Sequence, residues 1–194
     1  MLLEPYKKHP SRYLKFDFAE QLWQRRSYWE LRKNVFCEEQ RLFVGTDKDL
    51  FDTTAIPIIA SCYCMGMEDR VVGAVRIYQR EPGIWFGGRL AVDKEFRSLS
   101  RFQTLNLFPD NKTIHPFTLA VGGALIYKAV STATALGCRQ FLAHVQPQNV
   151  RFFERMHWKT IGTINKNGIQ HAVMEASLNY FQEVHSTPRD LKSA

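Results

Sequence analysis

The first forty residues carry a strand pattern followed by a helix pattern. Residues 13–18 alternate between polar and apolar side chains, which is typical of a strand with one buried face. The spacing over residues 20–40 then changes to that of a helix, with apolar side chains at Leu22, Trp23, Tyr28, Leu31, Val35 and Phe36. The chain therefore opens with one strand and one long helix.

The middle of the chain predicts three strands in succession. Residues 56–66 and 70–79 are rich in apolar and β-branched side chains, and the turn Glu81-Pro82-Gly83 separates them from a third such segment, residues 84–92. Gly87 and Gly88 lie inside this third strand. Because glycine in a strand interior often marks a bulge or a close backbone approach, we expect an irregularity there.

The last third alternates helix and strand. A helix is predicted over residues 121–136, ended by Gly137, and a short buried strand over residues 141–145. Pro147 breaks that strand, and Asn149 is placed to cap a short helix with its side chain. Residues 159–164 and 169–178 predict a terminal hairpin. We expect one domain over residues 12–180, with a mobile segment at 1–11, a long insertion at about 97–119 and a loose tail at 181–194.

The start of the helix at residue 121 is the first candidate for chemistry. It is made of small residues, Ala120 to Ala124, and a helix N-terminus exposes unpaired backbone N–H groups that suit a phosphate. Small residues also allow close packing of a helix on a sheet. In this strand–helix context we favour the phosphate-binding interpretation.

The stretch from Gly137 to Trp158, GCRQFLAHVQPQNVRFFERMHW, resembles the Gcn5-related N-acetyltransferases (GNAT). The family's ending has the form N-x-x-A-x-x-F-Y-E-K-x-G-F, and this chain has Asn149, Phe152, Phe153, Glu154, Arg155, His157 and Trp158 in those places. The resemblance extends from about Arg12 to Leu178. It implies an α/β fold with a mixed, mostly antiparallel twisted sheet flanked by helices. It also implies a bulge in the strand at 84–92 that opens a V-shaped cleft for the cofactor.

The resemblance implies acetyl-CoA as co-substrate. The expected cofactor-binding residues are Leu90, Ala91, Val92, Ala120, Val121, Gly122, Gly123, Ala124, Asn149, Phe152 and Phe153. The family's phosphate loop has the form Q/R-x-x-G-x-G/A, and here Phe117, Ala120 and Gly122 stand at its arginine or glutamine and its two glycines. The charged side chain is therefore missing, and Arg97 or Arg101 from the insertion could replace it.

The N-terminal half resembles two GNAT branches, the acyl-homoserine-lactone synthases and a bacterial nitrogen-metabolism group of N-acetyltransferases. The resemblance rests on LRKNVFCEEQRLF, on the aspartates at 47, 49 and 52, and on VVGAVRIY, and it favours the second group through GGRLAV and FERMHW. The resemblance implies an acceptor side formed by Arg32, Phe36, Arg76, Arg89 and Gln146. The alternative is that Phe36 is a core residue and that the aspartates are solvated or cap helices.

Acetyl transfer to an amine needs a base and a group that protonates the leaving thiolate. The family's usual thiolate acid is a tyrosine, and Phe153 stands in its place. His144, His171 and Glu39 are the remaining candidates, and the family fold would put the two histidines on neighbouring strands. Each histidine is equally consistent with a hydrogen-bonded structural role, and Glu39 with a solvated helix end.

Composition narrows the partners. The formal charge is +7 with a pI near 9.3, but the 26 basic residues form no Lys/Arg-rich block, which argues against a nucleic-acid partner. No apolar run is long enough to span a bilayer and no signal peptide is recognisable, so we expect a cytoplasmic protein without a membrane partner. The four cysteines lack zinc-site spacing, so we expect reduced thiols and no metal.

We therefore expect an acetyl-CoA-dependent N-acetyltransferase that acts on the amine of a small molecule by direct transfer. Two alternatives stay open: an N-acyl amino acid or acyl-homoserine-lactone-type synthase, and a GNAT-like sensor that binds CoA without turnover. The apolar side chains of the insertion need burial, either as a lid over the cleft or as the contact of a homodimer.

Overall fold

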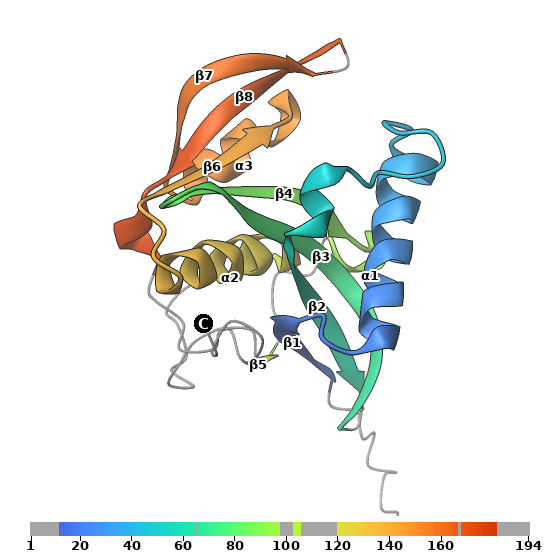
Figure 1. Ribbon diagram of the computed structural model, residues 1–194. Helices are drawn as coiled ribbons and strands as arrows, with labels where there is room; N and C mark the ends of the chain where they lie inside the picture. The colour runs from blue at the N-terminus through green and yellow to red at the C-terminus, as the bar shows by residue number, and fades with distance from the viewer. Residues whose placement is uncertain (1–11, 65, 98–102, 106–119, 167, 182–194) are drawn as a thin grey trace, which may run out of the picture.

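A computed structural model describes residues 12–64, 66–97, 103–105, 120–166 and 168–181. These residues form one eight-stranded mixed sheet in the order β5-β1-β2-β3-β4-β6-β8-β7 (Figure 1). The strands are β1 Arg12–Phe18, β2 Ile56–Cys64, β3 Met67–Glu81, β4 Ile84–Val92, β5 Gln103–Leu105, β6 Gln140–Val145, β7 Trp158–Lys166 and β8 Ile169–Ala176. The helices are α1 Leu22–Lys33, α2 Val121–Ala135 and α3 Val150–Arg155.

The strand directions confirm the mixed, mostly antiparallel sheet. Among the described strands, β1 with β5 and β4 with β6 pair in parallel, and the other pairings are antiparallel. The last strand, β8, inserts between β6 and β7, as the family resemblance implied.

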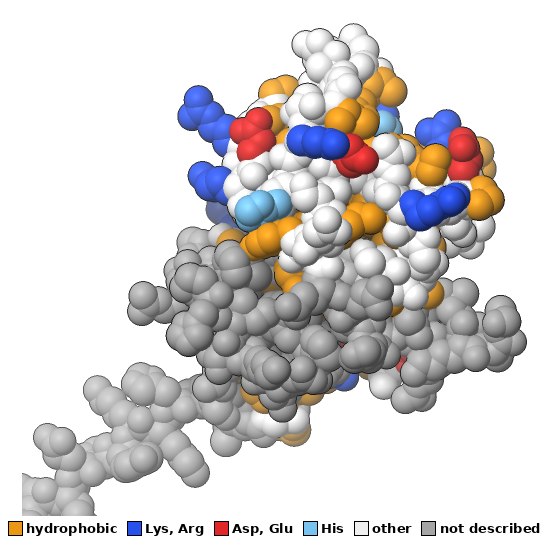
Figure 2. All heavy atoms as spheres, turned by 90° about the vertical axis from the view of Figure 1, so that its left-hand side faces the viewer, with side chains coloured by type: hydrophobic (Ala, Val, Ile, Leu, Met, Phe, Trp, Pro, Cys, Tyr) orange, Lys and Arg blue, Asp and Glu red, His pale blue; other side chains and the backbone are white. Residues whose placement is uncertain are grey.

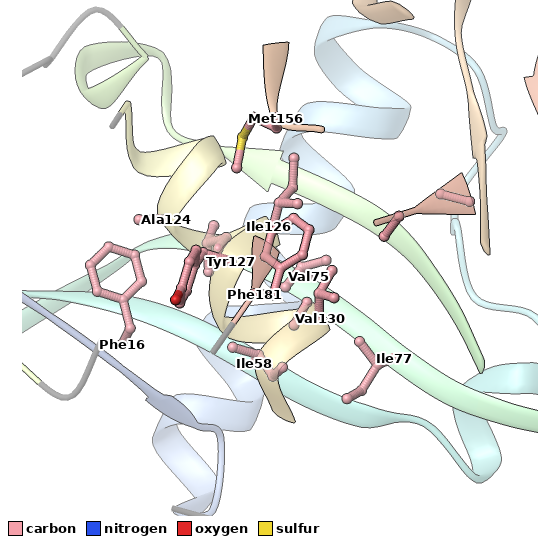
Figure 3. Close-up of a cluster of buried hydrophobic side chains, with 14 of the residues drawn as sticks. Phe16, Ile58, Val75, Ile77, Ala124, Ile126, Tyr127, Val130, Met156 and Phe181 are labelled. Atoms are coloured by element: carbon pink, nitrogen blue, oxygen red, sulfur yellow. The ribbon is translucent and has the colours of Figure 1, made fainter. Parts of the chain in front are cut away.

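The two long helices cover opposite faces of the sheet (Figure 1). α2 packs on the face that holds the main core, in which Phe16, Ile58, Val75, Val130 and Phe181 lie close together (Figure 3). α1 covers the other face through a smaller cluster. A Cβ on Gly73 of β3 would lie 2.7 Å from Cδ1 of Leu125 and 3.1 Å from Cβ of Ala60, so a larger residue there would force neighbouring side chains to shift.

The predicted helix over 20–40 differs from the structure in its second half. Regular α-helix ends at Lys33, and the chain continues as a π-helical turn, Asn34–Glu39. The N–H of Gln40 donates to the carbonyl of Val35, five residues earlier. The wider turn keeps both Val35 and Phe36 buried under the sheet.

The predicted side-chain cap at Asn149 is wrong. A short 3-10 turn, Pro147–Asn149, precedes α3, and Asn149 has φ of −99° and ψ of −8° without a side-chain hydrogen bond to the helix. A residue that caps a helix with its side chain usually has an extended backbone. The backbone of Asn149 is already helical, so its side chain is not placed to accept from the first N–H groups of the helix.

Most of the insertion and the terminal segments lie outside the described residues. Arg101 and the expected lid or dimer contact belong to this part. The three residues of β5 pair with β1, at the sheet edge farthest from β7. Phe181 is the one described residue of the expected tail, and it is buried in the main core.

One face of the molecule shows how the charged side chains of the described residues are distributed. On the face drawn in Figure 2, Lys and Arg side chains are scattered among Asp and Glu side chains and do not gather into one patch. Within the described ranges no helix is long and apolar enough to cross a membrane. The same ranges contain no group of three or more His, Cys, Asp or Glu side chains that could hold a metal ion. The four cysteines are free thiols.

Candidate active site

A divergence of β4 and β6 creates the candidate site. The two parallel strands pair only from Ile84 to Gly87 on β4, opposite Gln140 to Ala143 on β6. On its other side β4 pairs with β3, where Ala74 pairs with Ala91 and Arg76 pairs with Gly88. Between these two pairs β4 has two residues, Arg89 and Leu90, opposite the single residue Val75 of β3. Arg89, inside this bulge, has φ of +56°. The expected bulge is therefore confirmed, and it turns β4 away from β6.

A cavity of about 680 Å³ opens at this divergence and contacts both faces of the sheet. Its apolar half lies toward α2 and α3, and its polar half lies toward the loop that follows α1. The apolar wall includes Val75, Ile126, Ala129, Phe141, Phe153 and Trp158. The polar wall includes Asp49, Arg76, Arg89, His144, Lys166 and His171. A ligand in this cavity can therefore reach from the α2 side of the sheet to the α1 side.

Three arginines and three aspartates form one ion-pair network below and along the polar wall. Arg32 is fully buried and donates to Asp47 at 2.7 Å, to both oxygens of Asp52 at 2.7 and 3.0 Å, and to the hydroxyl of Tyr28. Asp47 is 2% exposed. Arg32 thus holds the loop from beneath, and the structure does not bring it to the cavity, where the family resemblance had placed it as a substrate-binding residue.

Arg76 and Arg89 form the upper part of the network and do line the cavity. Arg76 donates to both oxygens of Asp49 at 2.7 and 2.6 Å and contacts Asp52 at 2.7 Å. Arg89 donates to Asp49 at 3.0 Å and to the backbone carbonyl of Asp47 at 3.0 Å. The aspartates are therefore buried or half-buried ion-pair partners, and the solvated-loop alternative is wrong for them.

Burial and the network shift the protonation of these groups. The pKa of Asp52 is lowered to about 2: burial opposes ionisation, but hydrogen bonds from Arg32 and Arg76 outweigh it. The pKa of Asp49 is also lowered, again against burial, by the hydrogen bonds from Arg76. Both carboxylates stay ionised at neutral pH, and their lowered pKa values make them weak proton acceptors.

Aromatic rings surround the guanidinium of Arg89. Its Cζ lies 4.4 Å from the ring centroid of Phe43 and 6.0 Å from that of Phe36. Phe36 is both buried and part of the cavity wall, so it is a core residue, and its role on the acceptor side stays a prediction. These contacts fix the position of Arg89 while leaving part of its side chain exposed to the cavity.

The two histidines lie on adjacent strands, β6 and β8, and both line the cavity. Nδ1 of His171 lies 2.9 Å from the carbonyl of Ile169; since a carbonyl only accepts, Nδ1 donates and Nε2 is left for another contact. The pKa of His144 is lowered to about 4, first by burial and then by Lys166, His171 and Arg80. His144 is therefore neutral at pH 7.

Glu39 is separated from the histidines. It lies at the end of the π-helical turn, outside the cavity wall, and its two oxygens pair with the guanidinium of Arg97. Hydrogen bonding from Arg97 lowers the pKa of Glu39. Arg97 is thus paired with Glu39. It therefore does not replace the positive charge that is missing near the start of α2.

The expected cofactor residues fall on both sides of the divergence. Leu90 lines the cavity, and a Cβ on Gly122 at the start of α2 would lie 3.9 Å from its Cδ2 and 3.8 Å from Cγ2 of Val92. Asn149 and Phe153 line the cavity from the β6–α3 side, as does Gln146, which was expected on the acceptor side. Ala91 instead packs in the α1 cluster, and Phe152 packs against the main core beside Phe153.

The start of α2 has the backbone geometry of an anion site. Ala120 is the N-cap without a side-chain cap, and the first intrahelical hydrogen bond runs from the N–H of Ala124 to the carbonyl of Ala120, at 3.1 Å. The N–H groups of Val121, Gly122 and Gly123 therefore precede the helical hydrogen-bond ladder.

Some residues that line the cavity were not predicted from the sequence. Tyr78 lines the polar half, and its ring stacks on Phe51 at 4.6 Å between centroids. Lys166, the last residue of β7, lines the same half. Tyr78 is recognisable as a strand residue two positions from Arg76, but no local signal marks Lys166, because its approach depends on the hairpin folding over β6.

His144 predicts a measurable pH effect on stability. Its folded pKa of about 4 lies below the unfolded value of 6.5, so the unfolded chain takes up the proton first as the pH falls. Its contribution to stability is therefore lost between pH 6.5 and pH 4. We expect His144→Gln to lose less stability than the wild type between pH 7 and pH 5 in urea unfolding. An identical loss in both proteins would contradict the lowered pKa.

Comparison with known proteins shows that solved structures resemble this chain in fold, although their sequence identity to it is low. No family model matches the sequence, and no curated protein sequence matches it. An acyl-CoA N-acyltransferase structure from Pseudomonas aeruginosa is 16% identical with a TM-score of 0.61, over 86% of this chain and all of that one. ElaA from Escherichia coli is 18% identical with a TM-score of 0.63, over 84% of this chain and 99% of that one. The chain has the GNAT fold.

A further GNAT-fold structure comes from a CoA-dependent acyl-homoserine lactone synthase, BjaI, with S-adenosylmethionine and isopentyl-CoA. It is 15% identical with a TM-score of 0.59, and the match covers 88% of this chain and 86% of that one. The fold-level similarity thus spans N-acyltransferases and lactone synthases. It does not select the nitrogen-metabolism group that the sequence motifs resembled.

Proposed function

We propose that this protein is a CoA-dependent GNAT acyltransferase that moves the acetyl group of acetyl-CoA to the amine of a small molecule. The observation that carries the proposal is the divergence of β4 and β6 with a cavity through it. The start of α2 lies against Leu90 and Val92 of β4, and Leu90 lines the cavity, which also has a polar wall. Such an opening lets a thioester reach from one face and an amine from the other.

The cofactor side would use backbone and apolar side chains. The N–H groups of Val121 to Gly123, which precede the helical hydrogen-bond ladder, would take the pyrophosphate, because a helix N-terminus favours an anion. The pantetheine arm would pass between Leu90 on β4 and Asn149 and Phe153 on the β6–α3 side, which line the cavity. Phe153 has no ionisable group, so protonation of the leaving thiolate falls to solvent or to another residue.

The acceptor side would supply the base. His144 lies on β6 immediately beyond Ala143, the last β6 residue paired with β4, and it is neutral at pH 7. A neutral imidazole accepts a proton from the amine, directly or through water, as the nitrogen attacks the thioester carbonyl. His171 on the adjacent strand would receive or relay that proton.

The direct test is release of CoA thiol from acetyl-CoA in the presence of a panel of amines, with product detection by mass spectrometry. Amine-dependent thiol release with an N-acetylated product supports the transferase. CoA binding by calorimetry without thiol release for any amine would favour the CoA-binding sensor. Absence of both binding and release would contradict any CoA-dependent role.

His144→Ala is expected to lower kcat by about 100-fold, the low end for a general acid–base group. CoA affinity should change little, because His144 lies on the polar side of the divergence. The pH–rate profile should also change, which a purely structural role does not require. An unchanged profile would move the acid–base role to His171.

A second candidate function, synthesis with a longer acyl chain, is favoured by one observation. The α2 side of the cavity is lined by Ile126, Ala129, Phe141 and Trp158, an apolar surface suited to a hydrocarbon chain. The BjaI structure contains a branched acyl-CoA. Comparing kcat/KM for acetyl-CoA, longer acyl-CoA and an acyl carrier protein donor separates the candidates. A clear preference for acetyl-CoA would reject the longer donor.

A further inference from the structure

The polar half of the cavity has more positively charged side chains than carboxylates to pair with them. The network balances three guanidinium groups, on Arg32, Arg76 and Arg89, with three carboxylates, on Asp47, Asp49 and Asp52. Arg41 and Lys166 line the same cavity, and neither forms an ion pair with any residue in the described ranges. The chamber therefore carries about two uncompensated positive charges at neutral pH.

Lys166 brings one of these charges across the cavity from the network. It ends β7, at the tip of the terminal hairpin, whereas Arg89 and Asp49 belong to the opposite wall. The pKa of Lys166 is lowered, first by burial and then by Arg89. Arg89 and Lys166 both line the open cavity, so an anion between them would be attracted by both positive charges.

Arg76 provides an independent observation. It is buried, its two terminal nitrogens are taken by Asp49 and Asp52, and its Nε–H has no hydrogen-bond partner. A Cβ on Gly88, another cavity residue, would lie 3.9 Å from this Nε. Nε is closed to solvent, and a ligand oxygen would reach it only after a small shift of the wall at Gly88, where no side chain stands in the way. A buried donor without a partner is rare, and an oxygen of a ligand would satisfy it.

We infer that the acyl acceptor is an amine that also carries an anionic group, a carboxylate or a phosphate, bound among Lys166, Arg89 and Nε of Arg76. The inference rests on the proposed function for the reacting amine, whereas recognition of the anion is measured without turnover. The anionic group binds on the network side, and the amine points toward His144 and the divergence of β4 and β6. An α-amino acid has this chemistry, and so does an amino alcohol phosphate.

The same charges exclude another class of acceptor. Amines approach as ammonium ions, so a chamber with uncompensated positive charge repels polyamines and other polycations. An attached anion offsets that repulsion. An anion placed near Lys166 would also reduce one of the positive influences that lower the pKa of His144, and so strengthen His144 as a proton acceptor once the acceptor is bound.

Matched pairs of amines test the inference. The pairs phenylalanine and 2-phenylethylamine, tyrosine and tyramine, and lysine and cadaverine differ by one carboxylate, and O-phosphoethanolamine and ethanolamine differ by one phosphate. Binding to the CoA-saturated protein is measured by calorimetry, and turnover by thiol release. We expect the anionic member to bind at least about tenfold more tightly in one or more pairs. The pairs also show whether the anion is a carboxylate or a phosphate.

Two variants locate the recognition. Lys166→Met should reduce the preference for the anionic member by about tenfold, since it removes a charge-assisted contact and keeps the apolar stem. Lys33→Met, which removes one charge from the exposed end of α1, should leave that preference unchanged. If both variants lose the preference equally, the preference comes from the net charge of the protein. That result would overturn the assignment of anion binding to this chamber.

The outcomes separate this inference from the proposed function. If the amine without the carboxylate or phosphate binds more tightly or turns over faster in every pair, the inference of an anionic acceptor is overturned. The proposed acyltransferase function is not affected by that result. Binding of an anionic member without thiol release would support the chamber and contradict the transferase. Failure of every anionic member to bind at millimolar concentration would overturn the inference.

Discussion

Gly122→Glu is expected to reduce CoA affinity by on the order of 100-fold or more while the protein stays folded. The substitution puts a carboxylate and its bulk at the start of α2, where the N–H groups of Val121 to Gly123 precede the helical ladder. The fold should tolerate the change, because a Cβ at this position would meet Cγ2 of Val92 and Cδ2 of Leu90 at 3.8 and 3.9 Å, ordinary contact distances.

Two further substitutions at Gly122 divide the effect into its causes. Gly122→Ala adds only the Cβ and should bind CoA within a few-fold of the wild type, and Gly122→Gln adds the bulk of glutamate without its charge. Calorimetric titration with CoA, alongside circular dichroism, measures affinity and fold together. Unchanged affinity in a folded Gly122→Glu protein would show that the phosphates bind elsewhere.

Arg32→Met is expected to cost about 3–5 kcal/mol of unfolding free energy, enough to unfold a marginally stable protein. Arg32 is fully buried and compensates Asp47 and Asp52, which are 2% and 8% exposed. Removing the guanidinium leaves two buried carboxylates with less positive charge around them. The cost comes from these stranded charges more than from the lost contacts.

Arg26→Met is the matched control, because Arg26 lies on the exposed side of the same helix and should change stability by less than about 0.5 kcal/mol. Adding Asp52→Asn to Arg32→Met should recover part of the loss, since it removes one stranded charge. Urea unfolding of the wild type, Arg32→Met, Asp52→Asn and the double variant measures the coupling, with Arg26→Met as the separate control. A loss below about 1 kcal/mol in Arg32→Met would mean that the network carries little of the stability of the loop.

The network matters to function because it places the cavity wall. Between the π-helical turn Asn34–Glu39 and β2, the chain has little regular structure beyond the short 3-10 turn Leu50–Thr53, yet it carries Asp49 and Phe51 to the cavity. Ion pairs from α1, β3 and β4 hold it. A loop held by buried charges can form a rigid wall, and rigidity of that kind is what a positioned acceptor requires.

The hydrophobic pattern alone was enough to predict most of the elements. Alternation over residues 13–18 and the apolar segments at 56–66, 70–79, 84–92 and 141–145 correspond to β1, β2, β3, β4 and β6. Gly87 and Gly88 correctly indicated an irregularity in β4. Patterns of this kind are readable because burial of one face acts on each residue locally, at the period of its own strand or helix.

The contacts of the candidate site were decided by tertiary structure. Arg32 and Glu39 were both expected beside the acceptor, but Arg32 is buried beneath the network and Glu39 pairs with Arg97, 58 residues further along the chain. Lys166 reaches the cavity although no nearby residue marks it. Which charges meet depends on strand register and on the closing of long loops, and a single sequence carries no local signal for either. The sequence by itself therefore determined most of the strands, the helices and the start of α2. Only the folded chain determined which arginines pair with aspartates and which positive groups remain for a ligand.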